Sequence, residues 1–191
     1  EDSTYLNHID SNLWVIDPLD GTTNYLHGIP YFAVSIAYLE KNETKVGVVY
    51  VPVLNEMFYA VKGEGAYLNG KRIAVSKSDK LINALAVTGF ACIRANKPDN
   101  NLDNFNRIAP QLREIRRLGA AAADGCYVAS GRFDFFWEKY LCLWDIAASM
   151  LIVREAGGKV TDFKGNEDRI SGKTVIMSNK ILHNDILKII R

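Results

Sequence analysis

The 191-residue sequence predicts a layered α/β fold in which β-sheets are sandwiched between helices. Three observations predict it. Short apolar runs separated by turn residues come first, helical and strand-like segments alternate afterwards, and no linker rich in proline, glycine or serine divides the two parts. A single domain of this length can bury a sizeable core.

The first part of the chain predicts a meander of antiparallel strands. The apolar, partly β-branched run at residues 13–16 is the first strand, and we expect its ladder to stop at Pro18, which lacks a backbone N–H. Further strands are expected at residues 32–40, 46–51, 56–61, 66–68 and 84–88. Turns are expected at residues 41–44, at 62–65 and at Asn69-Gly70.

The second part predicts helices that alternate with strands. Apolar residues recur at helical spacing over residues 102–112, and a helix of small residues is expected from Gly119 to about Ala129. A third helix follows Trp144, with Asp145 as its N-cap and Gly157-Gly158 at its end. Strands are expected at residues 115–118, 132–137, 159–162 and 174–177, and a closing amphipathic helix at residues 180–190.

Composition narrows the class of protein. Lys and Arg number 23 against 22 acidic residues, so the charge gives no reason to expect a nucleic-acid or membrane surface. No apolar run approaches the length that spans a membrane. Cys92, Cys126 and Cys142 lack CxxC spacing, which predicts buried free thiols in a reducing, cytoplasmic compartment. Three scattered histidines do not support a zinc site, so any metal should be held by oxygen.

The segment Asp17-Pro18-Leu19-Asp20-Gly21-Thr22 collects metal ligands and backbone N–H donors at one point. A turn at Pro18 would let Asp17, the Leu19 carbonyl and Asp20 face one small volume. Gly21 would let the backbone approach a ligand closely, and a helix that starts there offers N–H groups without intrahelical partners. Divalent cations and phosphate both need such an arrangement. Taken alone, the pattern is more often a strand–turn–helix capped by Asp20.

A second segment changes this interpretation. Trp144-Asp145-Ile146-Ala147-Ala148, followed by Glu155-Ala156-Gly157-Gly158, accompanies the first motif. Together the two motifs resemble those of the inositol monophosphatase family of metal-dependent, lithium-sensitive phosphatases, over essentially the whole chain. The resemblance implies an αβαβα stack, one catalytic domain over residues 1–191 with a possible subdivision near 88–98, and a homodimer.

The resemblance also bears on the start of the chain. Glu1-Asp2 matches an acidic pair that precedes the first motif, and members of the family carry a helical segment before it. We therefore expect the sequence to be a truncated or partly ordered version of a longer protein.

The resemblance assigns roles around two Mg²⁺ ions. Glu1, Asp17 and the Leu19 carbonyl would hold the ion that activates water, and Asp17, Asp20 and Asp145 the ion near the leaving group. Thr22 would orient the attacking water. The phosphate would bind beside Asp20, at the N–H groups of Gly21 and Thr22. Mg²⁺ is the expected ion because it prefers oxygen ligands and retains waters.

The substrate side is matched less closely. Gly119-Ala120-Ala121-Ala122 resembles the loop whose backbone contacts a substrate hydroxyl, with Ala120 in place of the usual hydroxyl residue, and Ala121 is kept as a substrate contact. Glu138 lies seven residues before Asp145 and matches a glutamate that binds a ring hydroxyl. The alternative for Glu138 is a surface acid at the end of a strand.

The resemblance implies Mg²⁺-dependent hydrolysis of a phosphate monoester, most consistent with inositol monophosphate. Alternatives in the superfamily are fructose-1,6-bisphosphatase, histidinol-phosphatase and 3′-phosphoadenosine phosphatase. A hypothesis of another class is a binding partner in transcription antitermination complexes. A basic face at residues 113–117 could serve that role, although the metal ligands would then be unexplained.

Overall fold

The computed structural model describes residues 12–94, 96–167 and 173–190. Glu1 lies outside these residues. The first sheet contains β1 (Leu13–Asp20), β2 (Ala33–Glu40), β3 (Glu43–Val51), β4 (Glu56–Val61), β5 (Gly65–Leu68) and β6 (Lys71–Arg72). The second contains β7 (Leu85–Thr88), β8 (Glu114–Arg116), β9 (Phe135–Lys139), β10 (Lys159–Thr161) and β11 (Thr174–Ser178). The described helices are α1 (Thr22–Leu26), α2 (Ala91–Arg94), α3 (Leu102–Ile108), α4 (Ala121–Ala129), α5 (Leu143–Glu155) and α6 (His183–Ile189).

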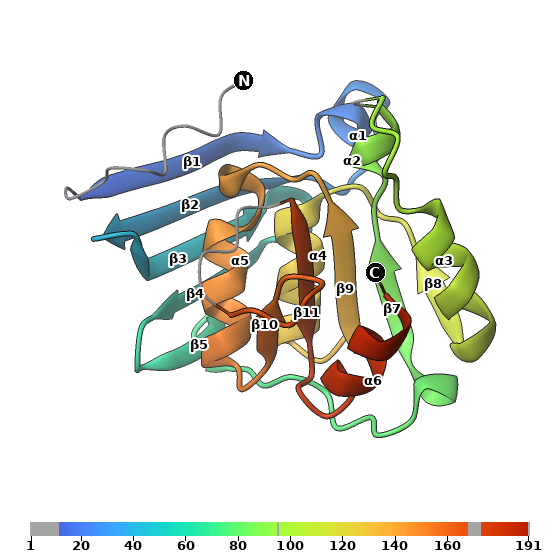
Figure 1. Cartoon of the computed structure of the whole chain (residues 1–191). Helices are drawn as coiled ribbons and strands as arrows, with labels where there is room; N and C mark the ends of the chain where they lie inside the picture. The colour runs from blue at the N-terminus through green and yellow to red at the C-terminus, as the bar shows by residue number, and fades with distance from the viewer. Residues whose placement is uncertain (1–11, 95, 168–172, 191) are drawn as a thin grey trace.

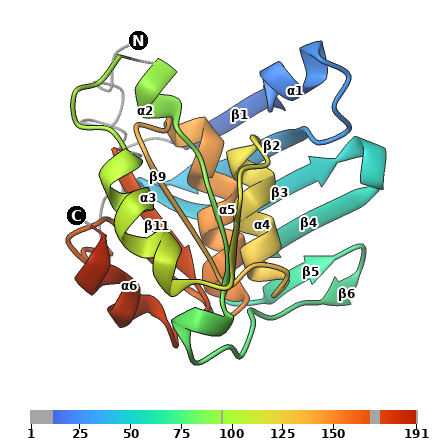
Figure 2. The same ribbon diagram turned by 90° about the vertical axis from the view of Figure 1, so that its right-hand side faces the viewer.

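The two sheets stack with helices between them (Figure 1). The six-stranded sheet has the order β1-β2-β3-β4-β5-β6, and the five-stranded sheet the order β10-β11-β9-β7-β8. Helices α4 and α5 lie between the sheets, while α3 and α6 pack on the opposite face of the five-stranded sheet (Figure 2). In the described residues the layers therefore run sheet, helices, sheet, helices, and the predicted layered α/β fold is confirmed.

The first sheet is the predicted antiparallel meander, with one tighter turn than expected. Lys41 and Asn42 both have positive φ, at 50° and 65°, and β3 already begins at Glu43. The connection is thus a two-residue hairpin turn, and the predicted four-residue turn at 41–44 was wrong, because two residues with positive φ already match the strand twist. Asn69 and Gly70 also have positive φ, which confirms the second tight turn.

Strand β1 does not stop at Pro18, contrary to the sequence prediction. Asp17 pairs with Ser35 and Asp20 pairs with Ala33, with a register shift between them. Three steps along β1 thus face two steps along β2, which is a β-bulge. Proline is tolerated at a bulge because no ladder hydrogen bond is needed from its nitrogen. The ladder is interrupted at Pro18 and resumes at Asp20.

In the second part, the predicted elements are present with shifted ends. Strand β9 begins three residues later than expected, because the N–H groups of Arg132 and Phe133 both bond to the Tyr127 carbonyl and extend the turn after α4. Helix α3 ends at Ile108, and a short 3₁₀ turn containing Pro110 follows. Strand β8 ends at Arg116, before the predicted end at residue 118, and helix α6 begins only at His183.

Helix α5 ends as predicted, at its two glycines. Gly157 has φ 85°, its N–H bonds to the Arg154 carbonyl, and the N–H of Gly158 bonds to the Val153 carbonyl. This is a Schellman motif, which satisfies the last carbonyl groups of the helix.

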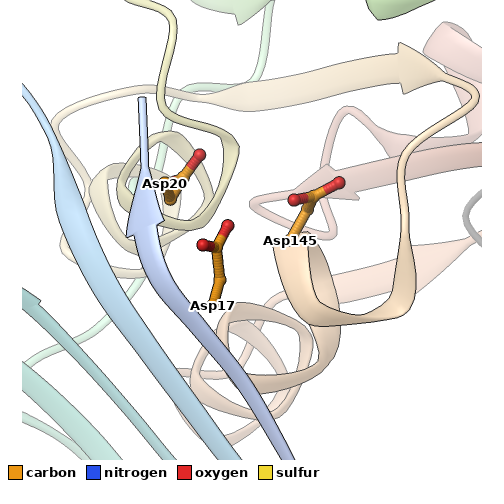
Figure 3. Close-up of side chains that lie close together, drawn as sticks. All are labelled: Asp17, Asp20 and Asp145. Carbon is orange, nitrogen blue, oxygen red and sulfur yellow. The ribbon is translucent and has the colours of Figure 1, made fainter. Parts of the chain in front are cut away.

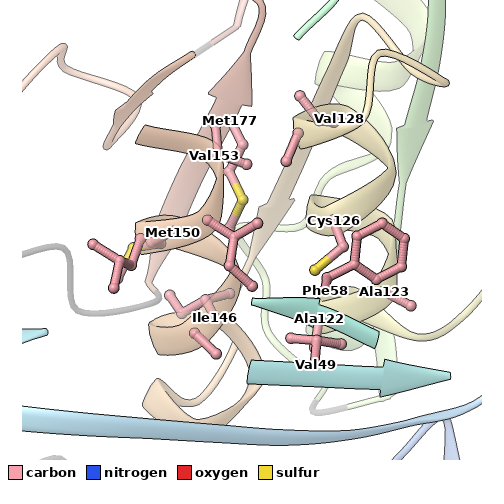
Figure 4. Packing of buried hydrophobic residues seen from close by; sticks show 14 of the residues in the cluster. Val49, Phe58, Ala122, Ala123, Cys126, Val128, Ile146, Met150, Val153 and Met177 are labelled. Carbon is pink, nitrogen blue, oxygen red and sulfur yellow. The ribbon is translucent and has the colours of Figure 1, made fainter. Parts of the chain in front are cut away.

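The main core lies between the two sheets, around α4 and α5 (Figure 4). Val49 and Phe58 of the first sheet meet Ala122 and Cys126 of α4 and Ile146 of α5, all fully buried. Small residues let the backbones approach closely. A Cβ on Gly47 of β3 would lie 2.8 Å from the Ala148 carbonyl oxygen, so this position of the sheet admits no side chain.

The remaining composition-based expectations have mixed outcomes. None of the helices in the described part of the chain is long and apolar enough to cross a membrane. The three cysteines are free thiols, as expected; Cys92 and Cys126 are buried, but Cys142 is only partly buried because it stands at the start of α5.

His183 joins α6 to the five-stranded sheet and yields a testable prediction. Its ring nitrogens contact the hydroxyls of Ser178 (2.7 Å) and Thr161 (2.9 Å) in a fully buried site. Burial lowers the pKa of His183 from 6.5 to about 4. The unfolded chain therefore takes up this proton first, and this contribution to the free energy of unfolding falls by ~3 kcal/mol as pH drops from 7 to 4.

Urea unfolding of the wild type and of His183→Gln at pH 7, 5.5 and 4.5 measures this contribution. Because carboxyl groups also titrate in this range, the quantity to compare is the difference between the two proteins. We expect the wild-type advantage to shrink as pH falls; an advantage that is constant with pH would contradict the assignment.

Candidate metal centre

Three aspartates from two distant parts of the chain converge at the end of β1. Asp17 and Asp20 come from β1 and Asp145 from the first turn of α5, and the three side chains lie close together (Figure 3). Each offers one oxygen to a group whose members all lie within 4.8 Å of one another. The two predicted motifs therefore form one site.

The bulge in β1 explains why Asp17 and Asp20 share a side of the sheet. In a regular strand, side chains three residues apart point to opposite faces. The extra residue restores the alternation, so that Asp17 and Asp20 both stand opposite the buried inner-face residues Ser35 and Ala33 of β2. The N–H of Leu19 donates to Asp17 Oδ1 at 2.9 Å, which fixes the Asp17 carboxylate across the bulge.

Asp20 is buried against the start of α4. Its Oδ1 accepts a hydrogen bond from the Ala121 N–H (3.2 Å) and its Oδ2 one from the Ala122 N–H (2.8 Å). Burial, together with the neighbouring Asp145 and Asp17 carboxylates, raises the pKa of Asp20 to about 8, although the two backbone hydrogen bonds oppose the shift. A bound cation would remove the repulsion and favour the ionised form.

Asp145 stands at the third position of α5 and not at its N-cap, so that prediction was wrong. Helix α5 begins at Leu143, and Cys142 is the N-cap. Asp145 Oδ2 accepts a hydrogen bond from the Cys142 N–H at 2.7 Å, as an acidic residue at the third helical position commonly does. The Ser35 hydroxyl donates to the Trp144 carbonyl at 3.2 Å, which joins the first turn of α5 to the strand residue opposite Asp17.

The donor set fits a hard divalent cation. Three carboxylates with no histidine or cysteine ligand suit Mg²⁺ and do not suit zinc. The Leu19 carbonyl, another predicted ligand, accepts a hydrogen bond from the Thr22 hydroxyl at 3.0 Å. The structure therefore brings Asp17, Asp20 and Asp145 together, while Glu1 lies outside the described residues.

Gly21 and Thr22 follow the carboxylates directly. Gly21 has φ 88°, and a Cβ there would lie 3.2 Å from the Ala120 Cβ, so both the conformation and the space favour glycine. Thr22 is the exposed first residue of α1.

Ala121 and Glu138, predicted on the substrate side, have protein partners. The Ala121 N–H bonds to Asp20, as described above. Glu138 lies within β9 and is buried, which excludes its reading as a surface acid. Glu138 Oε1 accepts a hydrogen bond from the Ala91 N–H at 3.0 Å, and the carboxylate packs over Gly89. Glu138 is not in the carboxylate group formed by the three aspartates.

Two buried residues beside the site were not predicted as parts of it. The side chain of Asn24 donates to the carbonyls of Tyr31 and Leu118, and Asp124 accepts a 2.8 Å hydrogen bond from the Tyr31 hydroxyl. Burial raises the pKa of Asp124 well above its usual range. The residues next to Asn24 and Asp124 in the sequence do not reveal these partners, because Leu118 lies 94 residues from Asn24 and Tyr31 lies 93 residues from Asp124.

Comparisons with known proteins identify the family. The model of the inositol monophosphatase family matches residues 4–191. The chain belongs to the inositol monophosphatase family. It is therefore a phosphatase, a phosphoric monoester hydrolase, by family.

Curated relatives of this family are similar over most of the chain. A fructose-1,6-bisphosphatase/inositol-1-monophosphatase of Thermotoga maritima is 44% identical over 178 residues, which cover 93% of this chain and 67% of the relative. A Nus factor SuhB of Pasteurella multocida is 44% identical over 191 residues, covering 99% of this chain and 72% of the relative. The chain thus spans about two thirds of the length of these relatives.

A solved structure supports the same family. The inositol monophosphatase of Anabaena has a TM-score of 0.91 and 40% identity, with 95% of this chain and 73% of that chain covered. The family fold therefore extends across the described residues.

The raised pKa of Asp20 makes the stability of the metal-free protein depend on pH. Because its pKa is raised from 3.8 to about 8, the folded metal-free protein holds a proton that the unfolded chain has lost, and stability falls as pH rises through this range. Asp20→Asn removes this dependence. We subtract the free energy of unfolding of the wild type from that of Asp20→Asn at each pH. We expect this difference to rise by roughly 3 kcal/mol from pH 5 to pH 8, because only the wild type loses stability.

Urea unfolding in the presence of a chelator measures this change. The substitution also alters a hydrogen bond of Asp20, but that effect does not vary with pH and cancels when the values at pH 5 and pH 8 are subtracted. Mg²⁺ added at pH 8 should stabilise the wild type more than Asp20→Asn. Equal pH profiles, together with equal responses to Mg²⁺, would contradict the metal centre.

Proposed function

We propose that this chain hydrolyses a phosphate monoester in a Mg²⁺-dependent reaction, with inositol monophosphate as the preferred substrate. The observation that carries the proposal is the convergence of Asp17, Asp20 and Asp145 within 4.8 Å at the end of β1. Phosphate monoesters hydrolyse extremely slowly in water, so a catalyst must supply charge and alignment. A compact group of carboxylates beside exposed backbone donors is suited to both tasks.

The aspartates would hold two Mg²⁺ ions. One ion would be bound by Glu1, Asp17 and the Leu19 carbonyl, and the other by Asp17, Asp20 and Asp145. When bound, the ions would supply positive charge that lowers the pKa of water and stabilises the phosphoryl and leaving oxygens. The backbone hydrogen bonds to all three aspartates support this role, because they hold the carboxylates in place before any cation arrives.

Thr22 is proposed to orient the attacking water. Its hydroxyl proton is directed at the Leu19 carbonyl, so a lone pair of the same oxygen can accept a hydrogen bond from a water molecule. The water would thereby be aligned beside the carboxylate of Asp17, which comes just before the same turn. The N–H groups of Gly21 and Thr22 would bind the phosphate, and Gly21 leaves room for it because it has no side chain.

Two residues are proposed for the alcohol part of the substrate. Glu138 would accept a hydrogen bond from a ring hydroxyl. Ala121 would contribute its N–H, whose hydrogen bond to Asp20 is 3.2 Å long and can be shared with a second acceptor. Both assignments favour a substrate with several hydroxyl groups. Fructose 1,6-bisphosphate is the next candidate, because the Thermotoga maritima relative is named a fructose-1,6-bisphosphatase as well as an inositol-1-monophosphatase.

A second candidate function is a role as a transcription-complex partner, as the name Nus factor SuhB of the Pasteurella multocida relative suggests. Exposed Arg113, Arg116 and Arg117 border a hollow of about 400 Å³ that Phe90 and Phe105 also line, which supports a protein-binding face. A pull-down of RNA polymerase that survives Asp17→Asn would favour this role. We also propose a homodimer located in the cytoplasm.

Phosphate release tests the enzymatic proposal. With inositol 1-phosphate and Mg²⁺ we expect turnover that falls on addition of Li⁺, and that drops at least about a thousandfold in Asp17→Asn, because a shared metal ligand is lost. Asp185→Asn is the matched control, since Asp185 is an exposed aspartate of α6 paired with Lys188. It should keep wild-type activity.

Fructose 1,6-bisphosphate, assayed in parallel, tests the choice of substrate. Faster turnover of this ester would reassign the substrate within the family. Failure of the wild type to release phosphate from either ester would contradict the proposal and favour the partner role.

A further inference from the structure

We propose that Asn24 is a positioning residue, which holds the turn that carries Thr22 against the segment in front of α4. The inference rests on the proposed function of Thr22 and concerns a residue outside the predicted site. It follows from the placement of one side-chain amide between two backbone carbonyls.

Asn24 is the buried residue of an otherwise exposed helix. It is 6% exposed, whereas Tyr25 and Leu26 beside it are 55% and 76% exposed. Its Nδ2 donates one hydrogen bond to the Tyr31 carbonyl at 2.7 Å and another to the Leu118 carbonyl at 2.8 Å. Both protons of the amide group are therefore used, and each goes to a different segment of the chain.

Helix α1 depends on such contacts because it is short. It has five residues, and its N-cap, Gly21, makes no side-chain capping hydrogen bond. A helix of this length does not form by itself in water, since nucleation costs more than the few hydrogen bonds return. Its exposed apolar side chains bury little surface, so Asn24 supplies the main polar anchor of α1 to the rest of the fold.

The end of β1 together with α1 contacts the segment at residues 118–122 at two points. Asp20 binds the N–H groups of Ala121 and Ala122, and Asn24 binds the carbonyl of Leu118. Between these points, a Cβ on Gly119 would lie only 3.3 Å from Asn24 Nδ2, so the side-chain amide of Asn24 lies close against the backbone of Gly119. Thr22 lies midway between Asp20 and Asn24 along the chain, and its orientation is set from both ends.

Loss of Asn24 should therefore separate metal binding from turnover. Asp17 is fixed by the bulge and the Leu19 N–H, Asp145 by the Cys142 N–H, and Asp20 by α4. None of these contacts involves α1. A displaced Thr22 would misalign the attacking water while the carboxylates stay in place, and misplacement of a catalytic group by about 1 Å can cost about a hundredfold in rate.

The test compares Asn24→Ala with Asn24→Asp and a matched control. Asn24→Ala leaves space in which water can bond the two carbonyls, and Asn24→Asp keeps the shape but sets an acceptor against them. The control is Asn179→Ala, because Asn179 is 2% exposed and its Nδ2 also donates twice, to the Ser76 hydroxyl (3.0 Å) and the Ser78 carbonyl (2.8 Å). Asn179 follows β11, and its N–H bonds to the Asp134 carbonyl just before β9, whereas the helix that carries Asp145 follows the other end of β9.

Three quantities are measured in each protein: kcat and KM for inositol 1-phosphate, Mg²⁺ affinity by calorimetry, and hydrogen exchange of residues 19–26. For Asn24→Ala we expect kcat to fall about ten- to a hundredfold, Mg²⁺ affinity to change less than about threefold, and exchange to quicken over residues 19–26. Asn24→Asp should lose more activity. Asn179→Ala should keep kcat, with any quickening confined to its own surroundings.

Opposite outcomes would overturn the inference. A kcat within about twofold of wild type in both Asn24 variants, or a fall in Mg²⁺ affinity that matches the fall in kcat, would refute the positioning role. If the wild type releases no phosphate, the proposed function fails, and hydrogen exchange alone then decides: unchanged exchange over residues 19–26 in Asn24→Ala would show that Asn24 does not hold the turn.

Discussion

Asp20 joins the six-stranded sheet to the helical layer, because its two carboxylate oxygens accept hydrogen bonds from consecutive N–H groups at the start of α4. The start of a helix carries a partial positive charge and N–H groups without intrahelical partners, so a carboxylate is stabilised there. This contact also places Asp20 beside Asp17 and Asp145. The rest of the site depends on it, since it is the contact that ties the end of β1 directly to the first N–H groups of α4.

The same contact has an electrostatic cost. Burial and two neighbouring carboxylates raise the pKa of Asp20 to about 8, so the metal-free fold keeps this group mostly protonated at neutral pH. Crowded like charges are unfavourable in a low-dielectric site unless a cation compensates them. The backbone donors that hold Asp17, Asp20 and Asp145 offset part of this cost. The site is therefore preorganised for a cation at the expense of stability in its absence.

Much of the fold could be predicted from the sequence, because alternation of apolar residues and the glycine and asparagine turns are local signals. The Asn69-Gly70 turn and the Gly157-Gly158 helix end are examples. The motifs also singled out three aspartates, distant in sequence, whose carboxylates the structure brings together. The bulge could not be predicted: a proline after a strand usually ends it, and only pairing with β2 shows that β1 resumes at Asp20.

Partners distant in sequence account for the other differences. Asp145 resembles an N-cap from its neighbours, yet the helix starts two residues earlier, with Cys142 as its cap. Asn24 shows the limit most clearly, because its partner Leu118 lies 94 residues away and no local pattern identifies it. The surface-acid alternative for Glu138 was wrong for a similar reason, because Glu138 is buried within β9.

The central claim is that the bulge in β1 gathers Asp17, Asp20 and Asp145 into a centre for divalent cations. Crystals grown with Mn²⁺, whose anomalous scattering distinguishes it from water, test the claim most directly. The account predicts anomalous density between these three carboxylates, lost in Asp17→Asn crystals. Ordered Mn²⁺ found only elsewhere, with the three carboxylates unchanged and without density between them, would contradict it.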